Sequence, residues 1–360
     1  MRTRAALLLL WLCSAPLAAA QERLHYPARP EPGQATTGQL VIHGALDLGH
    51  IRPLLASFHR QHPDIALTYR NLDTLPLYER FLAAPDEVDV LISSAMPWQY
   101  RLANDGHAQP LDSAAAAAWP DWARWRQELF AFTFEPVVMV VRRELIERFG
   151  RPESHADLLA LLQAHGDALA GRVVTYDPSR SGAGYTYAIE ESRLSPRYWD
   201  LVAAFGQARA HLVDTTGEML TGLAEGRYWL GYNLLGSYAR QVVERDPALE
   251  MVIPDDYALV TQRLALIPRQ APHPRSARRF LDYLIGLAGQ RVIAEQTALG
   301  AVHPGLDGPG TADHLRATHG EALRPLALGP GLLATLDDLK RQALLARWRR
   351  EFSRGGAAGD

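Results

Sequence analysis

The sequence of 360 residues has one cysteine, Cys13, and one lysine, Lys340. Cys13 lies in an N-terminal segment that we expect to be removed, so the mature chain is predicted to have no thiol, no disulfide and no cysteine chemistry. Beyond that segment no stretch stays apolar over about 18 residues, so we predict that the protein is not embedded in a membrane. The formal net charge is −3 and no basic block occurs, which argues against nucleic acid as a partner.

Motifs of several enzyme classes are also absent. The nucleophile-elbow pattern G-x-S-x-G fails around Ser181, because position 179 is serine rather than glycine. The sole lysine excludes a P-loop, no G-x-G-x-x-G follows a predicted strand, and no H-E-x-x-H occurs. We therefore expect that the protein is not an enzyme and needs no cofactor, with a hydrolase that uses Ser181 as the enzymatic alternative.

Residues 1–20 have the pattern of a secretory signal peptide, with MRTR, the apolar run AALLLLWL and three alanines before the predicted cleavage site. Cleavage there would move the formal charge from −3 to −5, because it removes Arg2 and Arg4. A lipoprotein signal at Cys13 is disfavoured, since Leu12 stands where a small residue is normally required. The protein is therefore predicted to be periplasmic, and residues 21–38, rich in Pro, Gly and polar side chains, to form a flexible leader.

The body of the chain alternates strand and helix signals. QLVIHGAL (39–46), IALTYRNL (65–72) and VDVLISSA (88–95) are predicted strands, with amphipathic helices between them. This β-α-β-α-β order predicts a parallel sheet covered by helices. In such sheets ligands bind beyond the carboxyl ends of the strands, so the loops that follow the first and third strands are marked as site candidates.

A second alternation occupies the middle of the chain between two long β runs. FEPVVMVVRREL (134–145) and YALVTQRLALIP (257–268) are predicted to cross between lobes. The expected fold is an α/β clamshell of two lobes joined by two crossing β-strands, with lobe 1 formed by 39–135 plus 260–360 and lobe 2 by 136–259. Two independent α/β domains in tandem are the alternative.

Two further segments carry local helix signals. SHADLLALL (154–162) is predicted to begin with Ser154 as N-cap, with Asp157 completing a capping box. Apolar residues at helical spacing predict extra C-terminal helices within 322–352, which we expect to pack on the first lobe.

The stretch DPSRSGAGYTYAIEE (177–191) follows the predicted strand GRVVTYD and leads into a helix. The first turn of a helix offers unpaired N–H groups and a partial positive charge, which together favour an anion. Glycines let the backbone approach a ligand, serines add donors, and an arginine offers a guanidinium fork. A plain N-cap is the alternative role for the serines. The predicted ligand-binding residues here are Ser179, Arg180, Ser181, Gly182 and Gly184.

Other predicted strand ends add candidates on both lobes. DTTGE (214–218) and GYNLLGSYAR (231–240) each lead from a strand or its end into a helix start. For Tyr232, packing in the core is an equal alternative to ligand contact. For His43, the alternative is a hydrogen-bonded structural role; as a ligand contact, His43 would be a pH-sensitive donor. The ends of the predicted strands 39–46 and 88–95 add residues of the first lobe. The candidates from all these strand ends and helix starts are His43, Ser93, Ser94, Thr216, Gly217, Tyr232, Asn233 and Ser237.

The order GRVVTYDPSRSGAGYTYAIE followed by DTTGEMLTGLAEGRYWLGYNLLGSYA resembles the type II periplasmic solute-binding proteins of ABC importers. Within them it is most similar to the group that binds ferric ion, phosphoglycerate and hexose phosphate. The resemblance covers about residues 38–304 and implies a clamshell whose cleft closes on a solute.

This resemblance implies an extracytoplasmic protein, usually a monomer, that delivers its solute to an ABC permease. Some members of the group instead signal to a membrane sensor kinase, and that alternative stays open. The ferric binders use neighbouring tyrosines, whereas this chain has no Tyr-Tyr pair, so no metal site is predicted and ferric ion is a lesser alternative. The hydroxyls, the helix start and Arg180 predict a small phosphorylated or carboxylated solute.

Overall fold

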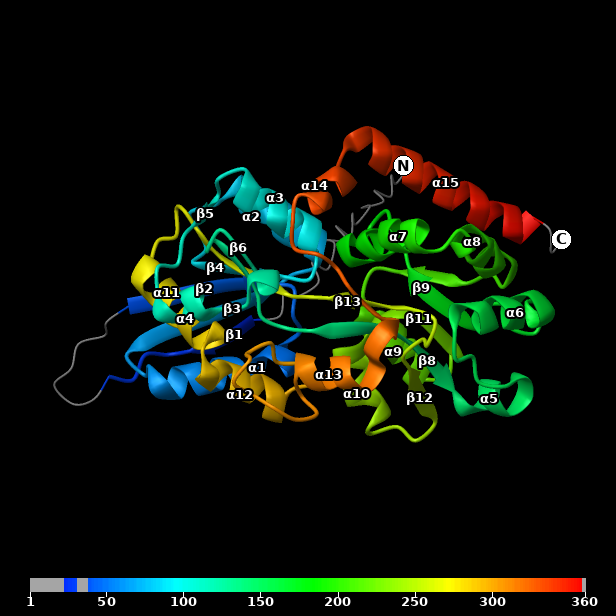
Figure 1. The fold of residues 1–360 in the computed structure, drawn as a ribbon, viewed down its shortest axis with the longest axis horizontal. Helices are drawn as coiled ribbons and strands as arrows, with labels where there is room; N and C mark the ends of the chain where they lie inside the picture. The colour runs from blue at the N-terminus through cyan, green and yellow to red at the C-terminus, as the bar shows by residue number, and fades with distance from the viewer. Residues whose placement is uncertain (1–22, 31–37, 358–360) are drawn as a thin grey trace, which may run out of the picture.

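The computed structural model describes residues 23–30 and 38–357, which fold into two lobes that lie side by side (Figure 1). Each lobe is built on one β-sheet with helices on its faces. The α/β clamshell predicted from the sequence is confirmed. The predicted signal peptide and most of the second half of the predicted leader lie outside the described residues.

The first lobe contains an eight-stranded sheet. Its strands are β1 (Arg23–Tyr26), β2 (Gly38–Gly44), β3 (Ile65–Asn71), β4 (Val90–Ser93), β5 (Ala108–Gln109), β6 (Arg124–Trp125), β7 (Leu129–Ala131) and β14 (Leu264–Pro268). Their order is β1-β3-β2-β4-β14-β7-β6, with β5 also paired to β14. The three predicted strands β2, β3 and β4 are parallel, so their carboxyl ends meet at one edge of the sheet.

The second lobe contains a seven-stranded sheet. Its strands are β8 (Glu135–Arg142), β9 (Val173–Tyr176), β10 (His211–Val213), β11 (Leu230–Leu235), β12 (Leu249–Val252), β13 (Ala258–Thr261) and β15 (Leu323–Pro325). Their order is β10-β9-β11-β8-β13-β15, with β12 also paired to β8. β9, β10 and β11 are parallel, so this sheet also presents strand ends at one edge.

Two segments cross between the lobes where the sequence predicts them. The first runs from β7 into β8, and the second runs from β13 through Gln262 and Arg263 into β14. β8 and β13 are antiparallel neighbours, with Glu135 opposite Thr261. The two crossings therefore lie side by side and form the hinge region of the clamshell.

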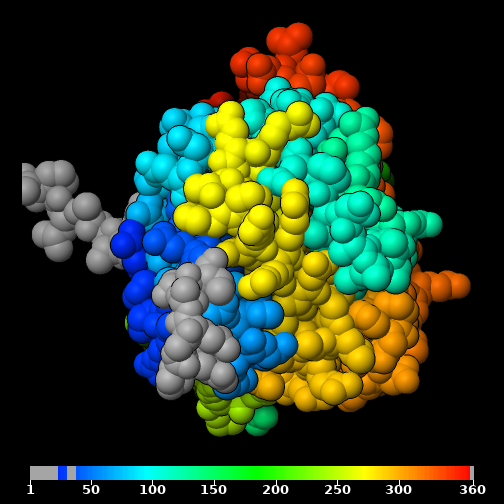
Figure 2. Space-filling view, turned by 90° about the vertical axis from the view of Figure 1, so that its left-hand side faces the viewer, coloured from blue at the N-terminus to red at the C-terminus, as the bar shows by residue number. Residues whose placement is uncertain are grey.

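Helices pack on both faces of each sheet (Figure 1). The helices that cover the first sheet lie either between its strands in the sequence or in the segment that follows β14. Figure 2 shows that these segments, distant in the sequence, lie together on the surface of the first lobe. They are α1 (Leu48–Gln61), α2 (Thr74–Ala83), α3 (Met96–Asn104), α4 (Ala114–Ala118), η1 (Asp121–Ala123), α11 (Pro274–Ile285) and α12 (Leu287–Gln296). The second lobe carries α5 (Arg143–Phe149), α6 (His155–His165), α7 (Gly182–Leu194), α8 (Tyr198–Gln207), α9 (Thr216–Ala224) and α10 (Gly236–Val243).

The C-terminal segment bridges the lobes. It comprises α13 (Ala312–His319), η2 (Gly320–Ala322), β15, α14 (Gly331–Thr335) and α15 (Asp338–Ala357). α14 packs against α3 of the first lobe, whereas α15 packs against α8 of the second (Figure 1). The prediction that the C-terminal helices pack on the first lobe is therefore wrong for α15, because its apolar residues Trp348 and Phe352 join clusters of the second lobe.

The predicted flexible leader is also partly wrong. Arg23–Tyr26 form the edge strand β1, which pairs antiparallel with β3 over four residues. β3 would otherwise leave its outer edge unpaired, and a short chain segment can satisfy that edge without being apolar. The Pro-rich and Gly-rich composition of the neighbouring residues gives no sign of this strand.

We predict that Gly206→Val lowers the free energy of unfolding by about 1–3 kcal/mol, the usual cost of overpacking. A Cβ at Gly206 of α8 would lie 1.8 Å from the backbone oxygen of Phe352, so α15 would have to move away. Urea unfolding checks the effect. Gly49→Val is the matched control, because a Cβ there meets no atom within 4 Å. Equal stability of the two variants would contradict the close packing of α8 and α15.

Candidate functional site

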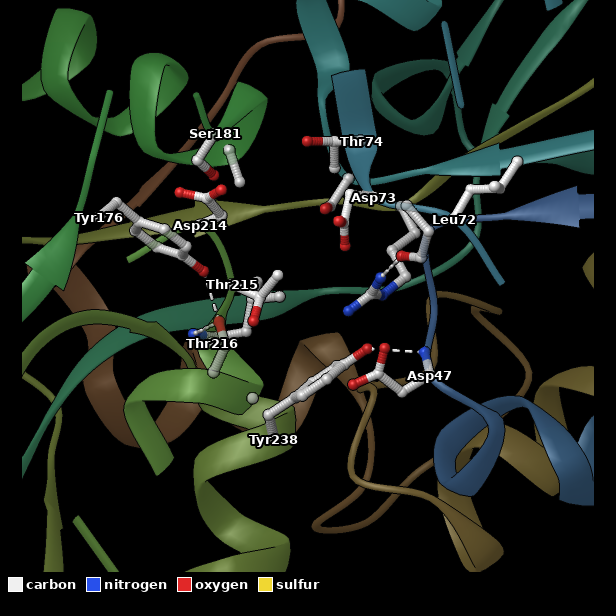
Figure 3. Close-up of a pocket in the computed structure, with 16 residues that line it drawn as sticks. Asp47, Leu72, Asp73, Thr74, Tyr176, Ser181, Asp214, Thr215, Thr216 and Tyr238 are labelled. Atoms are coloured by element: carbon white, nitrogen blue, oxygen red, sulfur yellow. Dashed lines mark hydrogen bonds between the residues drawn. The ribbon is translucent and has the colours of Figure 1, made fainter. Parts of the chain in front are cut away.

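A cleft with a cavity volume of about 60 Å³ lies between the two lobes. It is lined by both lobes and by the second crossing segment, and Figure 3 shows most of its polar side chains pointing toward the same space. The first lobe contributes Ala45, Asp47, Leu72, Asp73, Thr74 and Ser94; the second contributes Tyr176, Ser181, Ala183, Asp214, Thr215, Thr216, Gly217, Leu235 and Tyr238; Arg263 comes from the crossing.

Six helices begin at this cleft. α1, α2 and α3 start from the first lobe and α7, α9 and α10 from the second. Five of them have the N-cap or a first-turn residue in the cleft wall, and α3 has Ser94, the residue just before its N-cap. The strands before all six helices deliver the chain to the same sheet edges, which explains why the starts converge. Each start presents N–H groups that have no partner within the helix and a partial charge of roughly +0.5. The cleft is therefore rich in backbone donors.

The N-caps of these helices are of two kinds. Ser181 and Thr215 accept hydrogen bonds from the N–H groups of Gly184 and Glu218, both at 3.2 Å, so they satisfy part of their own helix starts. Asp47 and Asp73 occupy the N-cap positions of α1 and α2 but their carboxylates make no cap hydrogen bond. Both residues line the cleft, and the carboxylate of Asp47 accepts a hydrogen bond from the amide of Asn71.

The lobes touch each other across the cleft. The N–H of Asp47 donates to the hydroxyl of Tyr238 at 2.9 Å, and the N–H of Gly182 donates to Oγ1 of Thr74 at 3.2 Å. The ring of His50 stacks on Tyr238 with the ring centres 3.8 Å apart. These contacts join residues of opposite lobes, so the structure holds the clamshell in a closed arrangement.

Arg263 is fully buried in the wall of the cleft. Its Nε donates to Glu135 at 2.9 Å, and Nη1 donates to the carbonyl oxygen of Ala45 at 2.5 Å. Burial opposes the charged form, but Glu135 raises the pKa of Arg263 above its ordinary value. Glu135 also accepts from Thr133 and Ser237, so one ion pair connects both crossing segments and both lobes.

Asp47, Asp73 and Asp214 surround the open space in Figure 3. Burial raises the pKa of Asp73, and the nearby carboxylates of Glu218, Asp214 and Asp47 raise it further. Burial likewise raises the pKa of Asp214, although Arg180 acts in the opposite direction. The cleft thus combines helix starts, which favour negative charge, with carboxylates, which favour positive charge or hydrogen-bond donors.

Four of the predicted ligand-binding residues line the cleft, namely Ser94, Ser181, Thr216 and Gly217. Three others lie directly beside it. Ser93 accepts from the N–H of Ala95, Gly182 makes the contact with Thr74, and Gly184 donates to Ser181. A Cβ at Gly184 would lie 2.5 Å from that of Tyr176, so this glycine permits close packing of α7 on β9 rather than approach to a ligand.

Ser179 and Arg180 are exposed and do not line the cleft. The hydroxyl of Ser179 donates to Asp177 at 2.5 Å. The guanidinium of Arg180 lies 2.8 Å from Asp214 and 3.3 Å from Asp177. The predicted anion fork is therefore already occupied by two carboxylates, and Arg180 acts on the cleft only through Asp214.

His43 needs a larger correction. Its side chain is buried beside Arg70 and is not part of the cleft wall. Burial, reinforced by the positive charge of Arg70, lowers the pKa of His43 to about 4. The ring is therefore neutral across the physiological range, and the pH-sensitive contact predicted for it has no support.

Tyr232, Asn233 and Ser237 are buried but point to other partners. Tyr232 and Asn233 donate to Glu191 at 2.6 and 2.9 Å, and Ser237 donates to Glu135. The register of β11 shifts near Asn233, which has a positive φ of 65°. This irregularity changes which side chains face the cleft, and a simple alternation along the strand does not predict it.

Besides Thr215, the N-cap of α9, seven polar residues of the cleft are not among the ligand-binding residues predicted from the sequence. Asp47 and Asp73 follow strand ends and precede helices, so the rule that marked the serines could have found them. Arg263 carries no such signal, because it lies between β13 and β14 and not between a strand and a helix start. The missed residues are Asp47, Asp73, Thr74, Tyr176, Asp214, Tyr238 and Arg263.

Within the described residues, no helix is long and apolar enough to cross a membrane. The comparison with solved structures finds a substrate-binding protein of an ABC transporter from Agrobacterium tumefaciens, with 35% identity over 92% of this chain and 98% of that chain and a TM-score of 0.88. AfuA from Actinobacillus pleuropneumoniae with fructose-6-phosphate bound has 16% identity and a TM-score of 0.71, over 88% of this chain and 99% of that chain.

Iron-bound HitA from Pseudomonas aeruginosa also has 16% identity, with a TM-score of 0.64 over 87% of this chain and 99% of that chain. The last two similarities establish the fold only. A search of curated proteins finds no match. The model of the family "Bacterial extracellular solute-binding protein" matches residues 49–296. The chain therefore belongs to the bacterial extracellular solute-binding protein family.

Proposed function

We propose that this protein captures a small metabolite with a phosphate or carboxylate group in the periplasm and delivers it to an ABC importer. The convergence of six helix starts from both lobes on one cleft carries the proposal. The 35% identical Agrobacterium tumefaciens protein is described as the substrate-binding protein of an ABC transporter, which supports the delivery step.

The negative group of the solute would bind where hydroxyls and helix starts come together. Ser94, Ser181 and Thr216 stand at or near the starts of α3, α7 and α9. Hydroxyl and backbone donors at a helix start suit an oxyanion without requiring a separate cation. Because the donors come from opposite lobes, the solute would gain its full set of contacts only after closure, and this difference between the two states drives closing.

The experiment is a thermal-shift screen over sugar phosphates, glycerates, di- and tricarboxylates and ferric citrate. A solute that binds only the folded state raises the melting temperature by mass action. We expect stabilisation by at least one phosphorylated or carboxylated compound. Stabilisation by ferric citrate alone would contradict the proposal.

Gly217→Leu should weaken binding of the best compound by about tenfold or more, equivalent to about 1.4 kcal/mol. A Cβ at Gly217 would lie 3.6 Å from Asp47 in the cleft, so the larger side chain fits the fold but occupies space for the solute. Calorimetric titration measures the affinity. Gly331→Leu is the control, since its Cβ meets nothing within 4 Å and lies on α14. Equal affinities in both variants would mean that the solute binds elsewhere.

Ferric-ion binding has less support. The tyrosines of the cleft, Tyr176 and Tyr238, are buried, and burial raises the pKa of both hydroxyls, that of Tyr176 to about 12. A raised pKa disfavours the phenolate that would ligate the ion. Among residues 23–30 and 38–357, no group of three or more His, Cys, Asp or Glu side chains is arranged to hold a metal.

Signalling to a membrane sensor kinase is the other alternative. Docking to a sensor through α15 would use the arginines near the end of this helix, yet several of them already make contacts within the protein. Arg347 stacks on Trp199, Arg341 lies over Tyr185, and Arg350 pairs with Glu351. These contacts favour a structural role for α15, so delivery to an importer is the proposal we retain.

A further inference from the structure

We propose that the solute carries a protonated amine as well as its anionic group, and that Asp47, Asp73 and Asp214 bind the amine. This inference rests on the proposed function, because it concerns the same cleft. The three carboxylates come from three separate loops, two of the first lobe and one of the second, yet they line one space (Figure 3).

The protein itself supplies little positive charge to these carboxylates. Asp47 accepts a hydrogen bond from the neutral amide of Asn71 at 3.1 Å. The carboxylate of Asp73 makes no hydrogen bond or ion pair with any described residue. Asp214 alone has a cationic partner, Arg180, and that guanidinium also serves Asp177.

The buried cation of the cleft does not fill this need. Arg263 lies close enough to Asp47 for the two charges to influence each other, but its Nε and Nη2 are directed to Glu135. Glu135 therefore offsets the charge of Arg263. In formal charge, the cleft wall stays negative where the three carboxylates meet.

A second observation indicates a ligand at the same place. Ser94 lines the cleft, the residue as a whole is only 2% exposed, and its hydroxyl has no hydrogen-bond partner in the described part of the chain. Buried polar groups are almost always satisfied, so an unpaired hydroxyl that faces a cleft points to a bound molecule. Ser94 stands at the start of α3, where an anionic group would be favoured.

Together these features describe a zwitterionic solute. The helix starts attract its anionic end, and the carboxylates attract its ammonium end. An anion without an amine would place its charge near three carboxylates, of which only Asp214 has a cationic partner in the described residues. A hydroxyl in place of the amine would satisfy hydrogen bonds but would leave the charge repulsion in place. An ammonium group satisfies the hydrogen bonds and also removes the repulsion.

The test uses matched pairs of probes that differ only in an amine or a hydroxyl. The pairs are glucosamine 6-phosphate and glucose 6-phosphate, phosphoethanolamine and 2-hydroxyethyl phosphate, and β-alanine and 3-hydroxypropionate. We expect the amine member of at least one pair to bind at least tenfold more tightly in calorimetric titration of the wild-type protein.

The variant Asp73→Asn then tests whether the carboxylate of Asp73 causes the preference for the amine. It removes a charge while keeping the shape, and no hydrogen bond from a described residue depends on that carboxylate, so the variant should fold and melt no lower than the wild type. Its affinity for the amine member should fall about tenfold, with little change for the hydroxyl member. Asp86→Asn, at an exposed aspartate outside the cleft, is the control and should preserve the preference.

Three results would overturn the inference: equal or tighter binding of the hydroxyl members, failure of every amine member to bind, or an amine preference that survives Asp73→Asn. The proposed function is judged separately. Binding of hydroxyl members or of other phosphates or carboxylates would leave it standing, while failure of all these compounds to bind would remove both.

Discussion

Glu135→Ala should lower the free energy of unfolding by about 3–5 kcal/mol, because it leaves the guanidinium of Arg263 buried without its counter-ion. Both side chains are almost inaccessible to water, with 0% and 1% of their surfaces exposed, and their closest atoms are 2.9 Å apart. The substitution also removes the acceptor for Thr133 and Ser237. Chemical denaturation followed by circular dichroism measures the loss.

The control for this experiment is Glu147→Ala. Glu147 is exposed on α5, and substitutions of this kind usually change stability by no more than about 0.5 kcal/mol. A loss below about 1 kcal/mol in Glu135→Ala would contradict the account of the hinge, since it would mean that Arg263 can find water or another partner. The pair would then contribute little to the junction of the lobes.

The second large effect is a dependence of stability on pH that comes from His155. Burial alone would lower the pKa of this ring, but hydrogen bonds to Asp256 and Glu191 raise it to about 9. The distances are 2.8 Å to Asp256 and 3.4 Å to Glu191. In the unfolded chain the pKa is about 6.5, so the folded state holds this proton much more tightly.

The sign follows from this difference. Stability from the charged ring is fully present below about pH 6.5 and is lost as the pH rises through about 9. The loss should be roughly 3 kcal/mol, at 1.36 kcal/mol for each pKa unit. Urea unfolding of the wild type and of His155→Gln at pH 6 and pH 9.5 measures it, and the difference between the two proteins should shrink as the pH rises. A difference that is the same at both pH values would contradict the charged ring.

The sequence was a good guide to the elements with local signals. Ser154 was predicted as the N-cap of a helix with Asp157 completing a capping box, and the structure contains both hydrogen bonds. The three strands that alternate with helices in the first lobe also form the predicted parallel sheet. In each case the information lies within a few residues of the chain.

Elements whose place depends on distant contacts were predicted less well. α15 carries an amphipathic pattern, which predicts a helix but does not say which lobe it covers. The edge strand β1 exists because β3 offers an unpaired edge, and nothing in the sequence of Arg23–Tyr26 itself predicts it. The ion pair of Glu135 and Arg263 likewise depends on the side-by-side arrangement of two segments that are 128 residues apart.

The residues of the candidate site also differ in how well the sequence predicts them. Ser94, Ser181 and Thr216 were found because each lies between a strand and a helix start, and those positions converge in this fold. Asp47 and Asp73 have the same placement, but a carboxylate cannot donate to an anion, so a pattern of anion donors does not include them. Tyr232 and Asn233 were placed wrongly because a shift of register in β11 turns them toward Glu191.

Closure of the lobes on a solute is the central claim, and the distance between the lobes tests it most directly. Spin labels at Glu79→Cys on α2 and Asp200→Cys on α8 would report this distance by pulsed electron resonance, since both positions are exposed and lie on opposite lobes. We predict a broad distribution with long distances without solute, which becomes narrow and shorter with the best-binding compound. A compound that binds and leaves the distribution unchanged would contradict the claim.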